Sequence, residues 1–150
     1  MSFSDDLKKE AGNVTKAIEE TVKVTAISLF SGVITRSPVG NTSLWKTKYP
    51  PANYVGGQFR SNWFLSFDTP SNKTTSNTNE GNQRASEVSG IAQRDYSDTY
   101  ILTNNLPYSE AIESGHSTQA PAGVVAPEVS RINQQIPRIE AAANKKFGVS

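Results

Sequence analysis

Apolar residues recur every three or four positions along the first third of the chain, which is the spacing of one face of a helix. The stripe consists of Phe3, Leu7, Ala11, Val14, Ile18, Val22, Ala26, Leu29, Phe30, Val33 and Ile34. Ser2 followed by Asp5, or Ser4 alone, is typical of a helix N-terminal cap. The spacing predicts one helix of roughly 30 residues, a rod of about 45 Å at ~1.5 Å per residue. Its weakest stretch is Thr21–Ile27, where β-branched residues favour a break or a strand.

Prolines and glycines punctuate residues 37–60, and Pro38 with Gly40 ends the helical pattern. We expect an extended loop there, anchored by Trp45, Tyr49 and Tyr54. In the next segment, 61–67, aromatic and polar residues alternate, which predicts a strand. Residues 69–83 carry almost no apolar side chains and predict an exposed, mobile loop.

The second half of the chain predicts short elements and a final helix. Residues 85–94 favour a short helix, and Tyr100–Thr103 a second strand. Asn104-Asn105 is expected to turn that strand into a short helix, with Pro107 in its first turn and Gly115 at its end.

The last helix is expected to open near Pro127, with its own apolar stripe of Val129, Ile132, Ile136 and Ile139. Pro137 lacks an amide donor, so the helix should kink or start afresh there. Together these elements predict a single α+β domain over residues 1–150. It contains a long N-terminal helix, a small antiparallel sheet, a short helix and a C-terminal helix.

Composition narrows the possible functions. Hydrophobic residues make up 35% of the 150 positions, which suggests a modest core supplemented by contacts with neighbouring chains. The absence of cysteine excludes disulfides and thiol catalysis, and a single histidine excludes a multi-histidine metal cluster. A net charge of +1 argues against a protein that mainly grips the nucleic-acid backbone. With no apolar stretch of membrane-spanning length and a charged N-terminus, we expect a soluble protein made in the cytoplasm.

Candidate chemistry is sparse. Glu110 and Glu113 lie three residues apart on the predicted short helix, a spacing that suits a metal or acid–base chemistry, and His116 follows them. No phosphate loop, nucleotide-binding glycine motif or nucleophile elbow accompanies them. We therefore interpret the two glutamates as a solvated helix face, and expect no enzyme activity, no catalytic residue, no cofactor and no metal. A small hydrolase that uses these three residues stays open as a distant alternative.

Charge is unevenly placed along the chain. Thr21–Phe67 holds five cations and no acid, whereas Asp68–Glu128 holds eight acids and three cations. Chance placement on a polar surface is one interpretation. The other is that the basic segment of one copy, with Arg36 and Arg60, meets the acidic segment of the next in a head-to-tail contact.

Two stretches carry a family resemblance. The first matching segment comprises SPVGN (37–41), LWK (44–46) and YVGGQFRSNW (54–63). The second comprises YILTNNLPY (100–108), ESGHS (113–117) and QAPAG (119–123), and is the more specific because about a dozen positions match in order. Together they resemble the neck or tail-completion (head–tail connector) proteins of tailed bacteriophages. Asn41 and the long insert to Gly56 replace the compact turn of many members, and residues 69–83 match no family pattern.

The resemblance implies a virion structural protein at the head–tail junction, assembled in the host cytoplasm. Such a protein would form a homo-oligomeric ring around the DNA channel, with six copies expected and twelve, as in a portal, also compatible. Its neighbours would be the portal, adaptor or head-closure proteins on one side and tail-tube or terminator proteins on the other. DNA would pass through without specific binding, and no membrane would be involved. A tail-terminator ring that caps the tail tube is the near alternative.

We expect surface that only other subunits cover, because the long apolar stripe exceeds what two short strands can bury. Trp63, in a predicted strand, favours the core, whereas Trp45, in a proline-rich loop, favours an interface. The candidate interface residues are Arg36, Trp45, Tyr54, Arg60, Asn105, Pro107, Tyr108, Gln119 and Pro121.

Overall fold

The computed structural model describes residues 2–39 and 56–150, and its longest element is the helix α1, Phe3–Arg36. The prediction of one long N-terminal helix is confirmed, and Thr21–Ile27 does not interrupt it. The helix begins with a capping box: Ser2 Oγ accepts a hydrogen bond from the Asp5 amide at 3.2 Å, and the Asp5 carboxylate accepts one from the Ser2 amide at 3.3 Å. Two otherwise unpaired amides are thereby satisfied at the free end of the helix.

The sheet is small and antiparallel, as expected. Strand β1, Phe64–Ser66, pairs with β2, Ile101–Thr103, in the register Phe64↔Thr103, Leu65↔Leu102 and Ser66↔Ile101. The first strand is shorter than predicted, because Gln58–Ser61 forms the helical turn α2. Gly57, at φ +94°, starts this turn. The prediction of extended chain through residue 60 and of a strand from residue 61 is therefore wrong at these positions.

Polar loop 67–80 leads to α3, Gly81–Ser89, which continues as the 3₁₀ turn η2, Gly90–Gln93. The predicted short helix at 85–94 is thus confirmed, although it begins four residues earlier and takes the end of the predicted 69–83 loop. Most of the rest of that loop is exposed, as expected.

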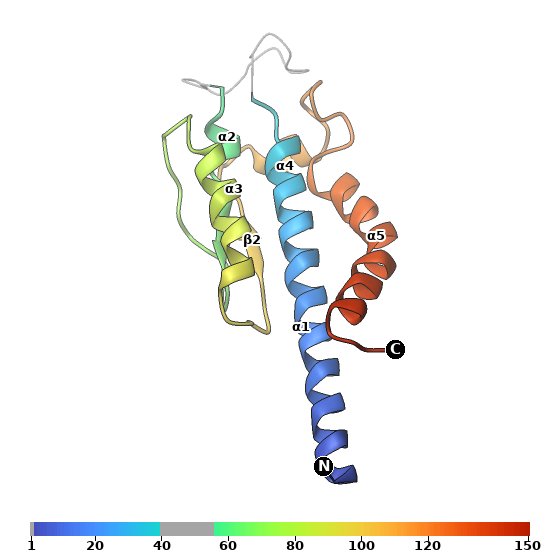
Figure 1. Cartoon of the computed structure of the whole chain (residues 1–150). Coiled ribbons are helices and arrows are strands. Elements are labelled where there is room, and N and C mark those ends of the chain that lie inside the picture. Colours follow the sequence, from blue (N-terminus) through green and yellow to red (C-terminus); the bar gives the residue numbers. More distant parts are fainter. Residues whose placement is uncertain (1, 40–55) are drawn as a thin grey trace.

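Two further helices follow β2. Helix α4, Ser109–Glu113, begins after Pro107 rather than around it, and Gly115, at φ +86°, ends the turn that follows. Helix α5, Val125–Lys146, contains Pro137 without interruption, so a fresh start at that residue is wrong. The helix instead changes direction about half-way along, as Figure 1 shows.

Helix α1 is the centre of the molecule (Figure 1). α3 and the sheet lie on one side of it and α5 on the other. The core gathers around the C-terminal half of α1, and Trp63, only 7% exposed, belongs to it as expected. The cluster comprises Ala26, Val33, Ile34, Phe59, Trp63, Val88, Ile91, Leu106, Ile112, Ala120 and Val124. Within the two described stretches, none of the helices combines the length and apolar character that crossing a membrane requires.

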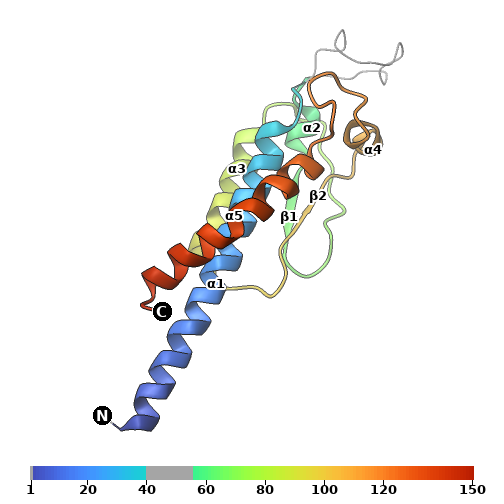
Figure 2. The same ribbon diagram turned by 90° about the vertical axis from the view of Figure 1, so that its right-hand side faces the viewer.

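The N-terminal part of α1 extends beyond all other described elements (Figure 2). α5 ends beside α1 near Glu20, whose carboxylate pairs with Lys146 at 3.0 Å. Residues 3–16, which we call the arm, are almost entirely exposed. Phe3 and Leu7 on the arm keep 78% and 54% of their surface exposed, and Ile18 just beyond it keeps 58%. The apolar stripe predicted from the sequence therefore has two parts, a buried one and a bare one.

Candidate functional site at the C-terminal end of α1

The described part of the first matching segment, residues 37–39 and 56–63, meets the second segment where α1 ends. Ser37 caps the helix: its hydroxyl donates to the Val33 carbonyl at 2.8 Å and accepts the indole N–H of Trp63 at 2.7 Å. Both side chains are buried, so this bond satisfies the polar atom of an otherwise apolar core residue. The sequence places Trp63 in the core, but nothing in it identifies Ser37 as the partner.

Arg60 closes the same helix end. Its Nη2 donates to the carbonyl oxygens of Thr35 at 2.9 Å and Ser37 at 2.7 Å. A guanidinium at this position satisfies carbonyls that a helix leaves unpaired and complements the negative end of its dipole. Burial lowers the pKa of Arg60, and its Nε is buried without a hydrogen-bond partner.

Side chains of the second matching segment bind the first. Asn104 Nδ2 donates to the Phe59 carbonyl at 3.0 Å, and the Tyr108 hydroxyl donates to Gln58 Oε1 at 3.3 Å. Gln119 Oε1 accepts the amide of Val39 at 3.1 Å. These bonds join positions between 45 and 80 residues apart in the chain. The second segment and the described part of the first therefore form one assembly around the end of α1.

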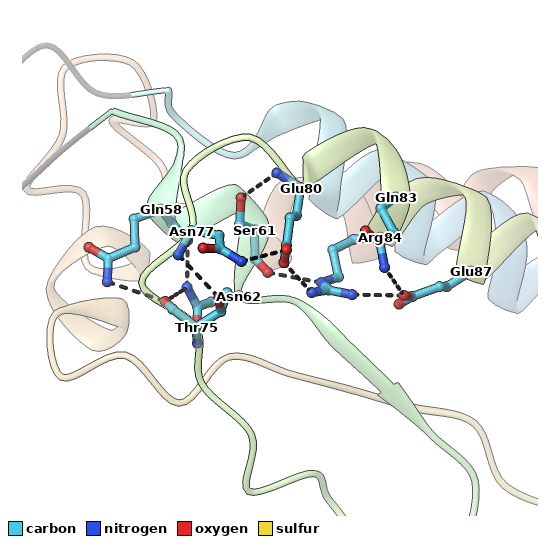
Figure 3. A network of polar contacts seen from close by, with 9 residues as sticks. All are labelled: Gln58, Ser61, Asn62, Thr75, Asn77, Glu80, Gln83, Arg84 and Glu87. Atoms are coloured by element: carbon cyan, nitrogen blue, oxygen red, sulfur yellow. Dashed lines mark hydrogen bonds and ion pairs between the residues drawn. The ribbon is translucent and has the colours of Figure 1, made fainter.

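Asn62 ties the polar loop to this assembly (Figure 3). The fully buried Asn62 amide donates to the carbonyls of Gln58 at 2.7 Å and Thr75 at 3.0 Å, and it accepts the Thr75 amide at 2.9 Å. Ser61 Oγ accepts the Glu80 amide at 3.0 Å, just before α3 begins. On the other side of the loop, Asn105 Nδ2 donates to the Ser71 carbonyl at 2.7 Å.

Arg84 is the buried charge of this region (Figure 3). It donates to the Ser61 carbonyl at 3.0 Å and forms ion pairs with Glu80, which precedes α3, and with Glu87 on the same helix. Its guanidinium also lies over the ring of Phe64, 4.4 Å from the centroid. Sequence reasoning missed this residue, although acids four residues before and three after it are a recognisable signal for helical ion pairs.

Glu113 caps α5, so the interpretation of Glu110 and Glu113 as a solvated helix face is wrong for Glu113. Its carboxylate accepts the amides of Val124 at 2.8 Å, Val125 at 2.9 Å and Ala126 at 3.0 Å. Burial acts to raise the pKa of Glu113, but these three backbone bonds outweigh it and hold the pKa below its ordinary value. Glu110 and His116 are exposed, and no group of three acidic, histidine or cysteine side chains in the described residues is arranged to hold a metal ion.

A buried carboxylate joins α5 to α1 close by. Glu128, 4% exposed, accepts from Arg36 Nε at 3.0 Å and from Arg131 Nε at 2.6 Å, while Arg131 Nη2 reaches the Ser28 carbonyl at 3.0 Å. Burial acts to raise the pKa of Glu128, but the hydrogen bonds and charges of both arginines lower it overall. A shallow groove of about 530 Å³ lies over this triad. Here a residue of the basic segment does meet one of the acidic segment, but within one chain.

The candidate interface residues divide into three sets. Asn105, Pro107, Gln119 and Pro121 are exposed, and Arg36 leaves 44% of its side chain exposed beside Glu128. Arg60 and Tyr108 are half-buried and hold the assembly together. Trp45 and Tyr54 lie outside the described residues, as does the part of the predicted loop from 40 to 55.

Comparisons of the chain with protein-family models, with curated proteins and with solved structures found no match.

Proposed function

We propose that the protein is a structural component of the head–tail junction of a tailed bacteriophage, where copies of it form a ring around the DNA channel. In this role it joins the tail to the portal or head-closure proteins and catalyses no reaction. The resemblance of two separate segments to neck and tail-completion proteins is the origin of the proposal.

The observation that carries the proposal is that the second segment packs against the described part of the first, residues 37–39 and 56–63. They lie tens of residues apart in the chain, yet Asn104, Tyr108 and Gln119 of the second all bind backbone or side chains of the first. Matching residues that converge on one place are better explained by a shared fold than by chance agreement. Several of them remain exposed there, including Pro107 and Pro121, where a neighbouring subunit can reach them.

The use made of the acidic side chains also favours a structural role. The Glu113 carboxylate accepts three backbone amides, and the Glu128 carboxylate pairs with two arginines, so both stabilise the positions of helices. A catalytic acid or base needs a free lone pair or proton directed at a substrate. The hydrolase alternative would have to use Glu110 and His116 without Glu113.

Purified recombinant protein tests the ring directly. We expect light scattering to give six or twelve times the subunit mass, and negative-stain images to show rings with a central hole. A monomer at every concentration, present in lysate but missing from purified virions, would favour the small-enzyme alternative and defeat the proposal.

A nonsense mutation in the gene separates the two structural roles. A joining protein predicts DNA-filled heads and complete tails that remain apart. A tail terminator predicts tails of uncontrolled length. Antibody labelling of intact virions should in either case mark the neck, and label on the distal tail or capsid faces would contradict the proposal.

A further inference from the structure

An apolar groove lies beside the middle of α1. It has a volume of about 420 Å³ and is bounded by Val22, Thr25 and Leu29 of α1, by Ile136 of α5 and by Asp98 and Tyr100 ahead of β2. One wall of the groove is α5, and the opposite wall is the chain segment that leads into β2. A groove with these walls suits an amphipathic helix whose apolar face is directed into it.

The same helix carries the matching face. Leu7, Ala11 and Val14 on the arm fall on the side of α1 that bears Val22, Thr25 and Leu29, because every step between neighbours in this series, with Ile18 included, is three or four residues. The arm cannot occupy the groove of its own chain, since α1 is continuous from Phe3 to Arg36. Each copy thus has an uncovered apolar helix and a separate place to receive one.

We propose that the arm of one copy binds in the groove of another. The occupant is a second copy because the chain itself supplies an uncovered apolar helix, and one residue on each surface carries the opposite charge. Asp98 is the charged residue among those that line the groove, and Lys8 lies beside Leu7 on the arm. Docking of Leu7 into the groove brings an ammonium group to the carboxylate at its rim.

Arm-to-arm pairing alone is a poorer solution. The arm is about two heptads long, shorter than the three or four that a coiled coil needs to be recognised and stable. It would also leave the groove uncovered. An arm in a groove covers both surfaces in one contact, and each copy makes that contact twice, once as donor and once as acceptor.

Closure of these contacts into a ring rests on the proposed function, but the arm–groove contact itself does not. A head-to-tail series of contacts closes into a ring, whereas a reciprocal exchange would pair two copies. The tests below therefore separate the contact from the ring.

Cysteine cross-linking tests the contact, because the natural chain has no cysteine. A Leu7→Cys variant is mixed with a tagged Thr25→Cys variant and oxidised. Within one helix these positions are roughly 27 Å apart, so a bond between them must join two copies. The matched control replaces Leu7→Cys with Lys9→Cys, two residues along the arm and on its opposite side.

We expect a mixed disulfide at a yield roughly ten-fold above the Lys9→Cys control, given the short reach of a disulfide. Equal yields, or bonds only between two Leu7→Cys chains, would overturn the inference. If the mixed bond forms but light scattering gives a dimer, the arm–groove contact stands and the proposed ring fails.

A charge exchange gives an independent test. Asp98→Lys and Lys8→Glu are both on exposed side chains, so neither should change the helical circular dichroism of the subunit. Each alone should weaken self-association by about five- to ten-fold, and the double variant should recover most of the loss. If the double variant loses as much affinity as the two single variants together, the pairing of Lys8 with Asp98 is contradicted.

Discussion

Glu113 joins two helices through one carboxylate, because three successive amides at the start of α5 donate to it. Glu113→Gln removes the charge and keeps the shape, so we expect it to lower the free energy of unfolding at neutral pH by about 1 kcal/mol, as other cap losses do. The pKa of Glu113 is lowered in the folded protein. Its stabilisation is therefore present above the unfolded pKa, near 4.3, and is lost as the pH falls through the folded value.

Denaturation in urea at pH 7 and at about pH 3 checks this expectation. The difference in the free energy of unfolding between the natural protein and Glu113→Gln should be smaller at the lower pH. Glu110→Gln is the matched control, since Glu110 is exposed on the same helix. Equal stability of Glu113→Gln and the natural protein at pH 7 would show that the charge of Glu113 contributes nothing.

Gly32 lies where α1 passes Glu128. A Cβ on Gly32 would come within 2.1 Å of Glu128 Oε2, which Arg36 and Arg131 hold in place. Gly32→Ala should therefore destabilise the protein by about 2 kcal/mol, the usual cost of overpacking. Gly12→Ala in the same helix meets nothing within 4 Å and should be neutral or stabilising, in line with helix propensity. Thermal unfolding of both variants decides between steric conflict and a general effect of glycine replacement.

At the level of residues, sequence patterns predicted whether a side chain is buried better than they predicted its hydrogen-bond partner. Trp63 is in the core as its strand pattern predicts, but its bond to Ser37 joins positions 26 residues apart that no local pattern connects. Glu113 shows the limit more sharply. Its spacing from Glu110 resembles a reactive pair, and only the turn that brings α5 back to α4 shows that it is a cap.

Among the elements, α1 is the one that the periodicity predicted most fully, and of the two predicted N-terminal caps the structure shows Ser2 with Asp5. Ser2→Ala removes a cap at the end of an arm that contacts little else in the described chain. We expect amide exchange to speed up in the first turns of α1 by about three- to ten-fold, corresponding to roughly 1 kcal/mol of local stability. The midpoint of thermal unfolding of the isolated subunit should not move.

Hydrogen exchange resolved along the chain measures the first quantity, and thermal denaturation followed by circular dichroism measures the second. Ser37→Ala is the contrasting variant, because Ser37 holds the other end of α1 against Trp63 in the core. It should lower the unfolding midpoint. A Ser2→Ala variant that unfolds globally at lower temperature would mean that the arm contributes to the core.

The shorter elements were predicted less well for identifiable reasons. α2 replaced predicted extended chain because Gly57 adopts a positive φ and Asn62 returns a bond to the Gln58 carbonyl, and neither is visible in an apolar pattern. α5 continues through Pro137, which is exposed, and the helix changes direction about half-way along its length. The proline rule therefore predicted a disturbance of this helix but not that the helix would stay continuous.

Across the whole molecule, the residues that stabilise the fold and the surface that we expect to associate lie on different halves of α1. The core, the two matching segments and the buried ion pairs gather around the C-terminal half of α1, while the bare apolar face lies on its N-terminal half. Arg36 and Arg60 have partners within their own chain, so their reversal to glutamate would disturb the fold and is a poor test of assembly. Variants on the arm do not have this drawback.

Association that depends on the arm should make thermal stability depend on protein concentration, because a contact between folded copies stabilises the folded state by mass action. For the natural protein we expect the unfolding midpoint to rise by several degrees over a roughly hundred-fold range of concentration. The double variant Leu7→Glu/Val14→Glu alters only exposed positions and should unfold at one midpoint throughout, equal to that of the natural protein at high dilution. Lys9→Glu, on the opposite side of the arm, should behave like the natural protein. If light scattering gave a ring while the natural midpoint were independent of concentration, association would not stabilise the folded subunit, and this would contradict an arm–groove contact between folded copies.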